Sequence, residues 1–472
     1  MSAGHPGTGI PSRHGQATSD RPGERRRPLV AEHGSTPMQV GAVLSLDTTG
    51  GLDPRNVIEQ LGARVVAVPR LRQRLVSVPV GCGRPIWLDD AGFDITRHVS
   101  VLEHGLRDEE AALRLAAERL GTPLPRDRPL WAATLATDPG GREAALILVF
   151  HHVLADGIGG LAVLGALADG ATPAGSTTFP RPRPTNRRIA ADMARLRLRA
   201  VAELPRAVLR LAAAARQLRV VGHPHPAPAG RTSPGKARPG RLPRTSLNVP
   251  TGPRRRFVSI RVDLAETLAA ARAERATVND VLLVAIAAAL RRLLEGRGER
   301  LDEFVVSVPF SARQQTTAGQ LGNASGVIPL RIPATGDARW RIRQVAALTR
   351  TAKRSARGAS TALIGPLFRL LARLGLYQRF IERQRLIHTF TSNLRGPAAP
   401  LTIFGCPISA LLPLSAATGN VTVAFAALSY AGTLAITVVA DPDACPDLDV
   451  VPAALAAEFT ALGIEVLRAG AG

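Results

Sequence analysis

Two adjacent histidines at the end of an apolar run are the residues of this sequence best suited to chemistry. Residues 151–160 read HHVLADGIGG and follow the run AALILVF directly. An imidazole titrates near neutral pH, so it can take a proton from an alcohol or an amine in a transition state. If an acyl donor arrives already activated as a thioester, a histidine acting alone as general base is sufficient. The pattern is compatible with such a base.

Metal binding, phosphate binding and a serine nucleophile fit these residues less well. Neighbouring side chains in a strand point to opposite faces, so His151 and His152 cannot easily bind one metal ion, and no metal site is predicted. The segment GIGG lacks the order GxGxxG and the Walker lysine, and no GxSxG occurs in the chain. A structural alternative stays open, in which both histidines are core residues with satisfied hydrogen bonds and Asp156 caps the following helix.

The composition is that of a globular protein with two domains. The chain has 472 residues, more than one core usually holds, and 45% of them are hydrophobic. Only 4% are aromatic, which speaks against stacking of single-stranded nucleic acid. The cysteines Cys82, Cys406 and Cys445 form no CxxC pair, so we expect no disulfide framework, no zinc site and a reducing cytoplasm. No cofactor is predicted.

The positive charge is concentrated in one segment. The formal net charge is +23, and residues 181–256 carry 19 Lys and Arg against two acids, a net charge of +17. Such a segment binds nucleic acid, an acidic membrane surface or a phosphorylated substrate. A solvated, Arg-rich surface explains it equally well.

Neither a signal peptide nor a transmembrane helix is predicted. Residues 1–28 are rich in Gly, Pro and Arg and contain no apolar run, as in a disordered tail. Residues 421–440 are uncharged and as long as a membrane span, but they are rich in Val and Thr and are broken by SYAG. We expect them to form an antiparallel hairpin buried in a soluble domain.

Strands and helices are mixed in both halves of the chain. MQVGAVLSLD, from Met38, is expected to be the first strand, and AALILVF, apolar throughout, a strand buried on both faces in the middle of a sheet. The predicted division is a disordered tail 1–36, an N-terminal subdomain 37–178 with the histidines, a basic Pro- and Arg-rich helical linker 179–246 and a C-terminal subdomain 247–472.

HHVLADG matches the HHxxxDG signature of the CoA-dependent acyltransferase superfamily. Further pieces occur in family order along the chain: PMQVGAVLSLD, RLRQRL, PLPRDRPLW, HHVLADG, TVNDVLLVAIAAALRRLL, SVPFSAR followed by LGN, SNLRGP and SYAGTL. On this ordered set the chain resembles the bacterial wax ester synthase/diacylglycerol acyltransferase family from Met38 to about Leu467.

The resemblance implies a mixed α/β fold of two chloramphenicol-acetyltransferase-like domains with the active site in a tunnel between them. Acyl-CoA would enter from one side and a lipid alcohol from the other. His152 would be the general base that deprotonates the acceptor hydroxyl for direct attack on the thioester. His151 and Gly157 would shape the site, and Asp156 would hold the loop structurally.

The resemblance also implies residues close to the substrates. Asn279 matches a family position near the active site, whereas its neighbour Asp280 is explained by a T-x-x-D capping box with Thr277. Six further candidates would line the tunnel or form a crossover between the domains; they are Ser392, Asn393, Gly396, Pro397, Gly322 and Asn323.

The N-terminal edge departs from the family pattern. VAEHGSTPM stands where the family usually has LSxxDxxF, and Gln39 stands where a His often follows the Met. These changes bear on the choice of acceptor more than on the chemistry.

The predicted function is acyl-CoA-dependent O-acyl transfer that forms triacylglycerol from diacylglycerol, or wax ester from a long-chain alcohol. The alternatives are a related HHxxxDG enzyme that acylates another hydroxyl or amine, and a catalytically inactive scaffold on lipid surfaces. The expected location is cytoplasmic, with the basic segment at an anionic membrane or lipid-droplet surface. No nucleic acid is expected as a partner.

Overall fold

The computed structural model describes residues 37–78, 85–171, 178–202, 242–311, 325–356, 371 and 374–467. The elements of the first half are β1 (Gln39–Asp47), α2 (Pro54–Val65), the 3₁₀ helix η1 (Pro69–Arg72), β2 (Gln73–Val76), β3 (Ile86–Asp89), the 3₁₀ helix η2 (Ile95–Arg97), β4 (Val99–Leu102), α3 (Glu109–Gly121), β5 (Trp131–Thr137), β6 (Glu143–His151), α4 (Gly157–Leu167) and α5 (Asn186–Ala202). The later elements are β7 (Arg256–Asp263), α7 (Leu264–Ala273), α8 (Val278–Gly296), β8 (Glu303–Ser311), β9 (Ser325–Pro333), α9 (Ala338–Ala356), α11 (Tyr377–Ile381), β10 (Thr389–Arg395), β11 (Thr402–Ile403), β12 (Cys406–Leu414), β13 (Val423–Tyr430), β14 (Thr433–Ala440), α12 (Val450–Ala461) and β15 (Val466–Leu467).

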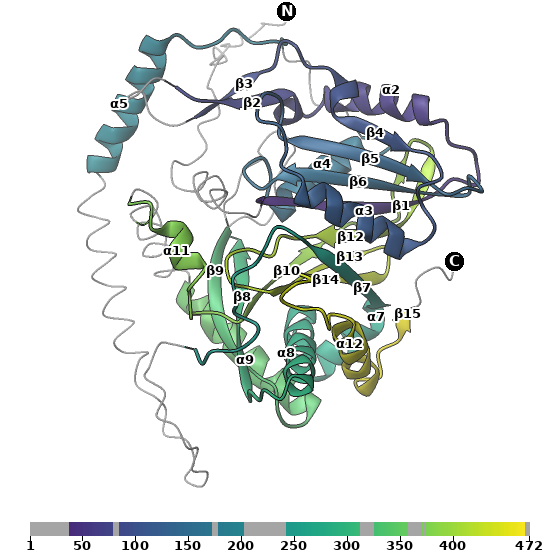
Figure 1. Cartoon of the computed structure of the whole chain (residues 1–472), viewed down its shortest axis with the longest axis vertical. Helices are drawn as coiled ribbons and strands as arrows, with labels where there is room; N and C mark the ends of the chain where they lie inside the picture. Colours follow the sequence, from purple (N-terminus) through teal and green to yellow (C-terminus); the bar gives the residue numbers. More distant parts are fainter. Residues whose placement is uncertain are drawn as a thin grey trace, which may run out of the picture.

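Two large sheets carry the fold, and both mix parallel with antiparallel pairs (Figure 1). The N-terminal sheet has the order β11-β12-β1-β6-β5-β4, and the C-terminal sheet has the order β15-β7-β14-β13-β10-β8-β9. β4 runs parallel to β5, and β10 runs parallel to both β13 and β8. β2 and β3 form a separate hairpin. The predicted mixed α/β class is confirmed.

β6 is the buried central strand that the sequence predicted. It lies between β1 and β5, and its side chains are buried on both faces. Leu146, Leu148 and Phe150 pack with α2 and α4 on the outer face of the N-terminal sheet. Ile147 and Val149 pack on the inner face, against residues of the C-terminal sheet. The two sheets therefore share an apolar interface.

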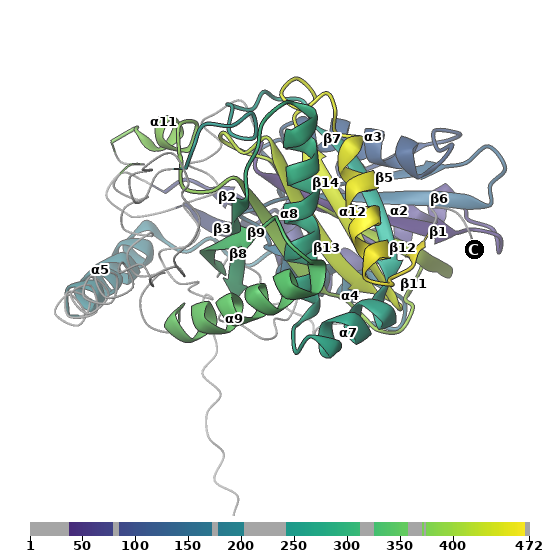
Figure 2. The same cartoon turned by 90° about the horizontal axis from the view of Figure 1, so that it is seen from below.

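α8 and α12 cover the outer face of the C-terminal sheet (Figure 2). α8 begins with the predicted capping box, in which the N–H of Thr277 donates to Oδ2 of Asp280 at 2.8 Å. Residues 280–287 of this helix are all buried, because it packs on the sheet, on α9 and on α12. The layers are thus α2 with α4, the N-terminal sheet, the C-terminal sheet, and α8 with α12.

The chain crosses between the sheets inside the predicted C-terminal subdomain. After β10 it adds β11 and β12 to the N-terminal sheet, where β12 pairs with β1, and it returns as β13. Asp169, which follows α4, accepts hydrogen bonds from the N–H groups of Phe404 (3.1 Å) and Gly405 (2.8 Å) in the turn of this crossover. Arg64 donates to Asp169 at 2.6 Å and lies over the ring of Phe404. The predicted division of the chain into continuous subdomains did not foresee that strands of the C-terminal subdomain join the N-terminal sheet.

Residues 421–440 form the predicted antiparallel hairpin. β13 pairs with β14 in unbroken register, from Val423 with Ala440 to Tyr430 with Thr433. Ala431 and Gly432 form the connecting turn, and both have positive φ (45° and 83°), as a type I′ turn requires. In the part of the chain that the structure describes, no helix combines the length and the apolar character needed to span a membrane.

Candidate active site

The backbones of two neighbouring segments hold the motif histidines. The N–H of His151 donates to the carbonyl of Leu130, directly before β5, at 3.0 Å. The N–H of His152 donates to the carbonyl of Met38, directly before β1, at 2.8 Å. The histidines are therefore fixed to both sides of the central strand and cannot shift unless the sheet shifts.

The imidazole of His152 is in the tautomer that a general base requires. Its Nδ1 lies 3.3 Å from the carbonyl oxygen of Ala155, in hydrogen-bonding geometry. A carbonyl only accepts, so Nδ1 carries the hydrogen in this contact and the lone pair of the neutral ring is on Nε2. The side chain is half-buried.

The surroundings lower the pKa of His152 below that of a free imidazole. Burial is the main cause, because it disfavours the charged imidazolium, and the neighbouring His151 acts in the same direction. The carbonyls of His152 itself and of Ala155, together with the charge of Asp156, oppose this shift without cancelling it. At neutral pH the ring is therefore unprotonated and able to accept a proton.

His151 is the opposite tautomer. Its Nδ1 accepts the N–H of Val153 at 3.0 Å, so the hydrogen of the neutral ring is on Nε2. Its side chain is buried and shares the inner face of β6 with Val149, since side chains alternate along a strand. His151 contributes to the turn that follows β6, and this geometry agrees with a shaping role.

Asp156 and Gly157 begin α4 and connect the motif to the C-terminal sheet. Asp156 is buried, and its Oδ1 accepts the N–H of Gly159 at 2.9 Å, as an N-cap does. A Cβ on Gly157 would lie 2.8 Å from the side chain of Leu394 in β10. The absence of a side chain at Gly157 thus allows α4 to pack on β10.

β10 contains two predicted substrate-binding residues, and only one of them lies on the face of the strand that is directed toward the motif. Ser392 shares a face of the strand with Leu394, which packs on the core of the N-terminal half. Asn393 lies on the opposite face, paired with Ala427 of the core under α8. Ser392 is therefore the candidate on this strand that is directed toward the motif.

Gly396 and Pro397 lie at the beginning of the crossover, one of the two locations that we expected. The N–H of Gly396 donates to the carbonyl of Ser429 at 2.9 Å, and a Cβ on Gly396 would lie 2.5 Å from that oxygen. The carbonyl of Pro397 accepts the N–H of Ala431 at 3.1 Å. The close approach of two backbones explains Gly396 without a substrate.

The remaining candidates belong to α8 or lie outside the described residues. Asn279 is half-buried in the first turn of α8, on the outer side of the C-terminal sheet. Its neighbour Asp280 accepts hydrogen bonds from Thr277 and from Thr349 (2.8 Å), as expected for a structural residue. Gly322 and Asn323 lie outside the described residues.

Gln39, at the position where the family often has a histidine, connects β1 to α3. Its side chain is buried, and Nε2 donates to the carbonyls of Leu120 (2.8 Å) and Thr122 (2.9 Å) at the end of that helix. Its Oε1 accepts the N–H of Leu124 at 2.8 Å. The backbone of Gln39 also pairs with His151 across β1 and β6. These hydrogen bonds explain the residue without a substrate.

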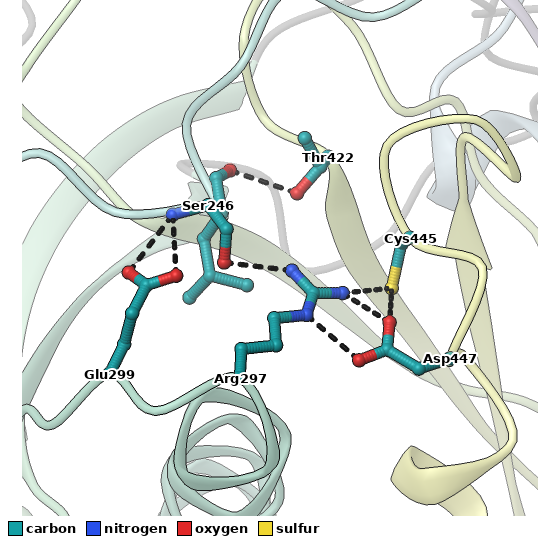
Figure 3. Close-up of polar contacts among 7 residues, drawn as sticks. Ser246, Arg297, Glu299, Thr422, Cys445 and Asp447 are labelled. Carbon is teal, nitrogen blue, oxygen red and sulfur yellow. Dashed lines mark hydrogen bonds and ion pairs between the residues drawn. The ribbon is translucent and has the colours of Figure 1, made fainter.

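A second polar cluster lies at the C-terminal end of α8 (Figure 3). Arg297 donates to Oγ of Ser246 (2.8 Å), to Sγ of Cys445 (3.0 Å) and to both carboxylate oxygens of Asp447. Burial raises the pKa of the Cys445 thiol to about 11, and Arg297 opposes that shift. Cys445 is therefore protonated at neutral pH. The hydrogen bond of Arg297 to Ser246 connects the segment around Ser246 to the end of α8.

Family comparisons agree with the motif and the fold. Residues 28–282 match the wax ester synthase/diacylglycerol acyltransferase catalytic domain, and residues 321–463 match the WS/DGAT C-terminal domain. The chain belongs to the WS/DGAT family. The HHxxxDG motif lies within the first matched range, and the crossover from β10 to β13 lies within the second.

Curated relatives of this WS/DGAT protein are similar over most of their length. A Mycobacterium tuberculosis protein provisionally named a diacylglycerol O-acyltransferase is 29% identical over 439 residues, which cover 89% of this chain and 85% of the relative. A second M. tuberculosis protein, also provisionally named so, is 29% identical over 407 residues, which cover 84% and 85%.

Solved structures confirm the fold. The wax ester synthase/diacylglycerol acyltransferase from Marinobacter aquaeolei superposes with a TM-score of 0.64 at 20% identity and covers 93% of this chain and 98% of its own. The first condensation domain of the calcium-dependent antibiotic synthetase has a TM-score of 0.59 at 20% identity, over 93% and 95%. The architecture of two chloramphenicol-acetyltransferase-like domains is therefore confirmed.

Replacing Gly157 with Ala is expected to lower acyl transfer, because the added Cβ collides with Leu394 and displaces the start of α4. Shortening the leucine removes the colliding atoms, so Gly157→Ala combined with Leu394→Ala should recover much of the lost kcat/KM. Leu394→Ala alone should cost roughly 2–3 kcal/mol of stability. The measurement is kcat/KM and thermal stability for the two single variants and the double variant.

Gly160→Ala is the matched control, since a Cβ there meets nothing within 4 Å in the same helix. It should keep full activity. Additive losses in the double variant would show that the contact between Gly157 and Leu394 does not position the motif.

Proposed function

We propose that this protein is an acyl-CoA-dependent O-acyltransferase that forms triacylglycerol from diacylglycerol, wax ester from long-chain alcohols, or both. Membership of the WS/DGAT family supports acyl transfer, and the names of the mycobacterial relatives support diacylglycerol as an acceptor. The observation that carries the chemistry is the geometry of His152, whose Nδ1 donates to Ala155 and whose lone pair is consequently on Nε2.

In the proposed reaction, Nε2 of His152 accepts the proton of the acceptor hydroxyl. The oxygen attacks the thioester carbonyl, and the resulting tetrahedral intermediate collapses to the ester and the thiolate of CoA. The thiolate then takes the proton from the imidazolium, which restores the neutral base. The carbonyl of Ala155 and the charge of Asp156 stabilise the imidazolium between these steps. No covalent intermediate on the protein is required.

The other motif residues have positioning roles in this proposal. His151 holds the turn after β6, Asp156 caps α4, and Gly157 allows the helix to pack on β10. Ser392 is our candidate for contact with a substrate, because it shares the face of Leu394. Asn279 and Asn393 remain weaker candidates, since both lie toward the outer side of the C-terminal sheet.

Replacing His152 with Ala is expected to reduce acceptor-dependent CoA release from palmitoyl-CoA by about 10²- to 10⁴-fold, the usual contribution of a general base. The assay compares diacylglycerol with hexadecanol, and the preferred acceptor identifies the reaction. His104→Asn is the matched control, because His104 is exposed and has a positive φ of 56° that Asn tolerates.

Three outcomes would separate the alternatives. Equal CoA release by the wild type and a folded His152→Ala variant would show that His152 is not the general base. Release with a different hydroxyl or amine acceptor would favour a related acyltransferase with another substrate. Binding to lipid surfaces without release with any acceptor would favour the inactive scaffold.

The pH profile of kcat/KM is expected to have an acidic limb with an apparent pKa below 6.5, the ordinary value for imidazole. Protonation of His152 removes the base, and burial lowers its pKa, so activity should persist to lower pH than an exposed histidine would allow. The limb should be absent from the residual rate of His152→Ala. An acidic limb with an apparent pKa above 6.5 would show that burial does not lower the pKa of the group that acts as the base.

We also propose that α5 contacts an anionic membrane or lipid-droplet surface. The helix exposes Leu198 (70%) and Val201 (61%) beside Arg195 and Arg199. Apolar side chains next to arginines fit the boundary between headgroups and acyl chains, where each basic residue contributes roughly 1 kcal/mol. A solvated basic surface remains the alternative.

Replacing Leu198 with Asp is expected to weaken co-sedimentation with vesicles of phosphatidylglycerol, since it places a negative charge in the contact. Val450→Asp is the control, because Val450 is also exposed (38%) but lies in α12, on the far side of the molecule from α5 (Figure 1). Equal sedimentation of both variants and the wild type would exclude α5 from the contact.

A further inference from the structure

α9 lies on the surface of the C-terminal half and is attached to it along one side. Ile342 and Val345 of this helix are buried in the same core as α8. Thr349, one turn further along, donates to the carboxylate of Asp280 in α8 at 2.8 Å. The inward side of α9 is therefore held by the core, and the other side faces solvent.

The outward side of α9 carries exposed apolar residues in line with small or uncharged ones. Trp340 is 43% exposed and Leu348 is 42% exposed. Residues three, four and seven positions apart share one side of a helix. The exposed residues with this spacing are Trp340, Gln344, Ala347, Leu348 and Thr351. We call them the tryptophan strip.

A line of arginines runs beside the tryptophan strip. Arg339, Arg343, Arg350 and Arg354 are all exposed, and they are separated by four, seven and four positions. This spacing also keeps them on one side of the helix, next to the tryptophan strip. We call them the basic strip. At 1.5 Å per residue the two strips run together for roughly 20 Å.

Acidic residues offset only part of this positive charge. The sequence of α9 contains five arginines, one lysine and no acidic residue. Arg343 pairs with Glu274 at 2.6 Å, and Asp337, directly before the helix, accepts the N–H of Trp340 at 2.9 Å. Arg350 donates to the backbone carbonyl of Arg275, a further exposed arginine, at 2.9 Å. The outward side of α9 is therefore a cationic surface.

α9 is on the same side of the molecule as α5. Figure 2 shows both helices along the lower edge, whereas α3 lies near the upper edge. α5 also combines exposed apolar residues with arginines. A single flat surface on that side could thus contact both helices.

We propose that α9 lies on an anionic lipid surface, with the basic strip at the phospholipid headgroups and the tryptophan strip at the boundary with the acyl chains. This inference rests on the proposed function, which makes a lipid the acceptor. Tryptophan is enriched at such boundaries, and basic residues bind anionic headgroups. Nucleic acid offers phosphates without an adjoining apolar layer, so it matches the basic strip alone. A lipid surface matches both strips.

Tryptophan fluorescence of the full-length protein reports directly on this contact. The chain has three tryptophans, of which Trp131 is buried and Trp87 is half-buried. Vesicles of phosphatidylglycerol are expected to shift the emission to shorter wavelength, because Trp340 leaves water. Trp340→Phe should still bind the vesicles but lose the shift, and Trp87→Phe, the matched control, should keep it. A shift that persists in Trp340→Phe would overturn the contact of α9.

A charge variant tests the basic strip. Arg339→Gln with Arg354→Gln alters both ends of the strip and leaves the buried side of α9 unchanged. Each basic residue near an anionic surface strengthens binding roughly five-fold, so partitioning into these vesicles should weaken about 10- to 30-fold. Arg107→Gln with Arg114→Gln removes the same charge beside α3, where both residues are also exposed. This control should bind as the wild type does, because salt screens distant charges.

The outcomes separate this inference from the proposed function. Equal partitioning of the strip variant and its control would overturn the contact of α9. An emission shift of Trp340 with heparin but not with vesicles would also overturn it, and would assign the basic strip to an acidic macromolecule. CoA release with a detergent-dispersed acceptor is measured separately and should be unchanged in the strip variant. Vesicle binding through α9 by a protein that acylates no acceptor would support the contact while rejecting the proposed function.

Discussion

The backbone hydrogen bonds that flank β6 determine where the two motif histidines lie. The N–H groups of His151 and His152 donate to segments on opposite sides of the central strand. The turn after β6 then begins from a fixed point, so the carbonyl of Ala155 reaches Nδ1 of His152 and Asp156 reaches the first turn of α4. A base at the end of an edge strand would lack one of these attachments.

Both ends of α4 depend on residues from the C-terminal half. At its start, Gly157 packs against Leu394 of β10. At its end, Arg64 donates to the carbonyl of Leu167 at 2.7 Å and pairs with Asp169, which also holds the crossover. Burial opposes ionisation of Asp169, but the hydrogen bonds from Gly405 and Arg64 outweigh it and keep its pKa below the ordinary value. The relative position of the halves and the position of the motif are therefore set by the same contacts.

Local patterns in the sequence predicted the parts of the fold that have local causes. An unalternating apolar run predicted the central strand, and T-x-x-D predicted the capping box of α8. The contact of Gly157 with Leu394 could not be predicted this way, because an apolar residue in a strand carries no sign of its distant partner. The hydrogen bonds of Gln39 could not be predicted either, since its partners lie at the end of α3, far away in the sequence. Successive side chains of a strand point to opposite faces, so the limits of β10 would have sufficed to place Ser392 and Asn393 on different faces of the sheet.

Burial has opposite consequences for the two kinds of cation at this end of the N-terminal sheet. An imidazole titrates close to neutral pH, so a lowered pKa leaves His152 uncharged and able to act as a base. A guanidinium starts so high that burial leaves Arg70 charged even with a pKa of about 10. Burial and His151 lower the pKa of His152, and the carbonyls of its own turn oppose that shift. At the same end of the sheet, burial therefore leaves the guanidinium charged and the imidazole neutral at neutral pH.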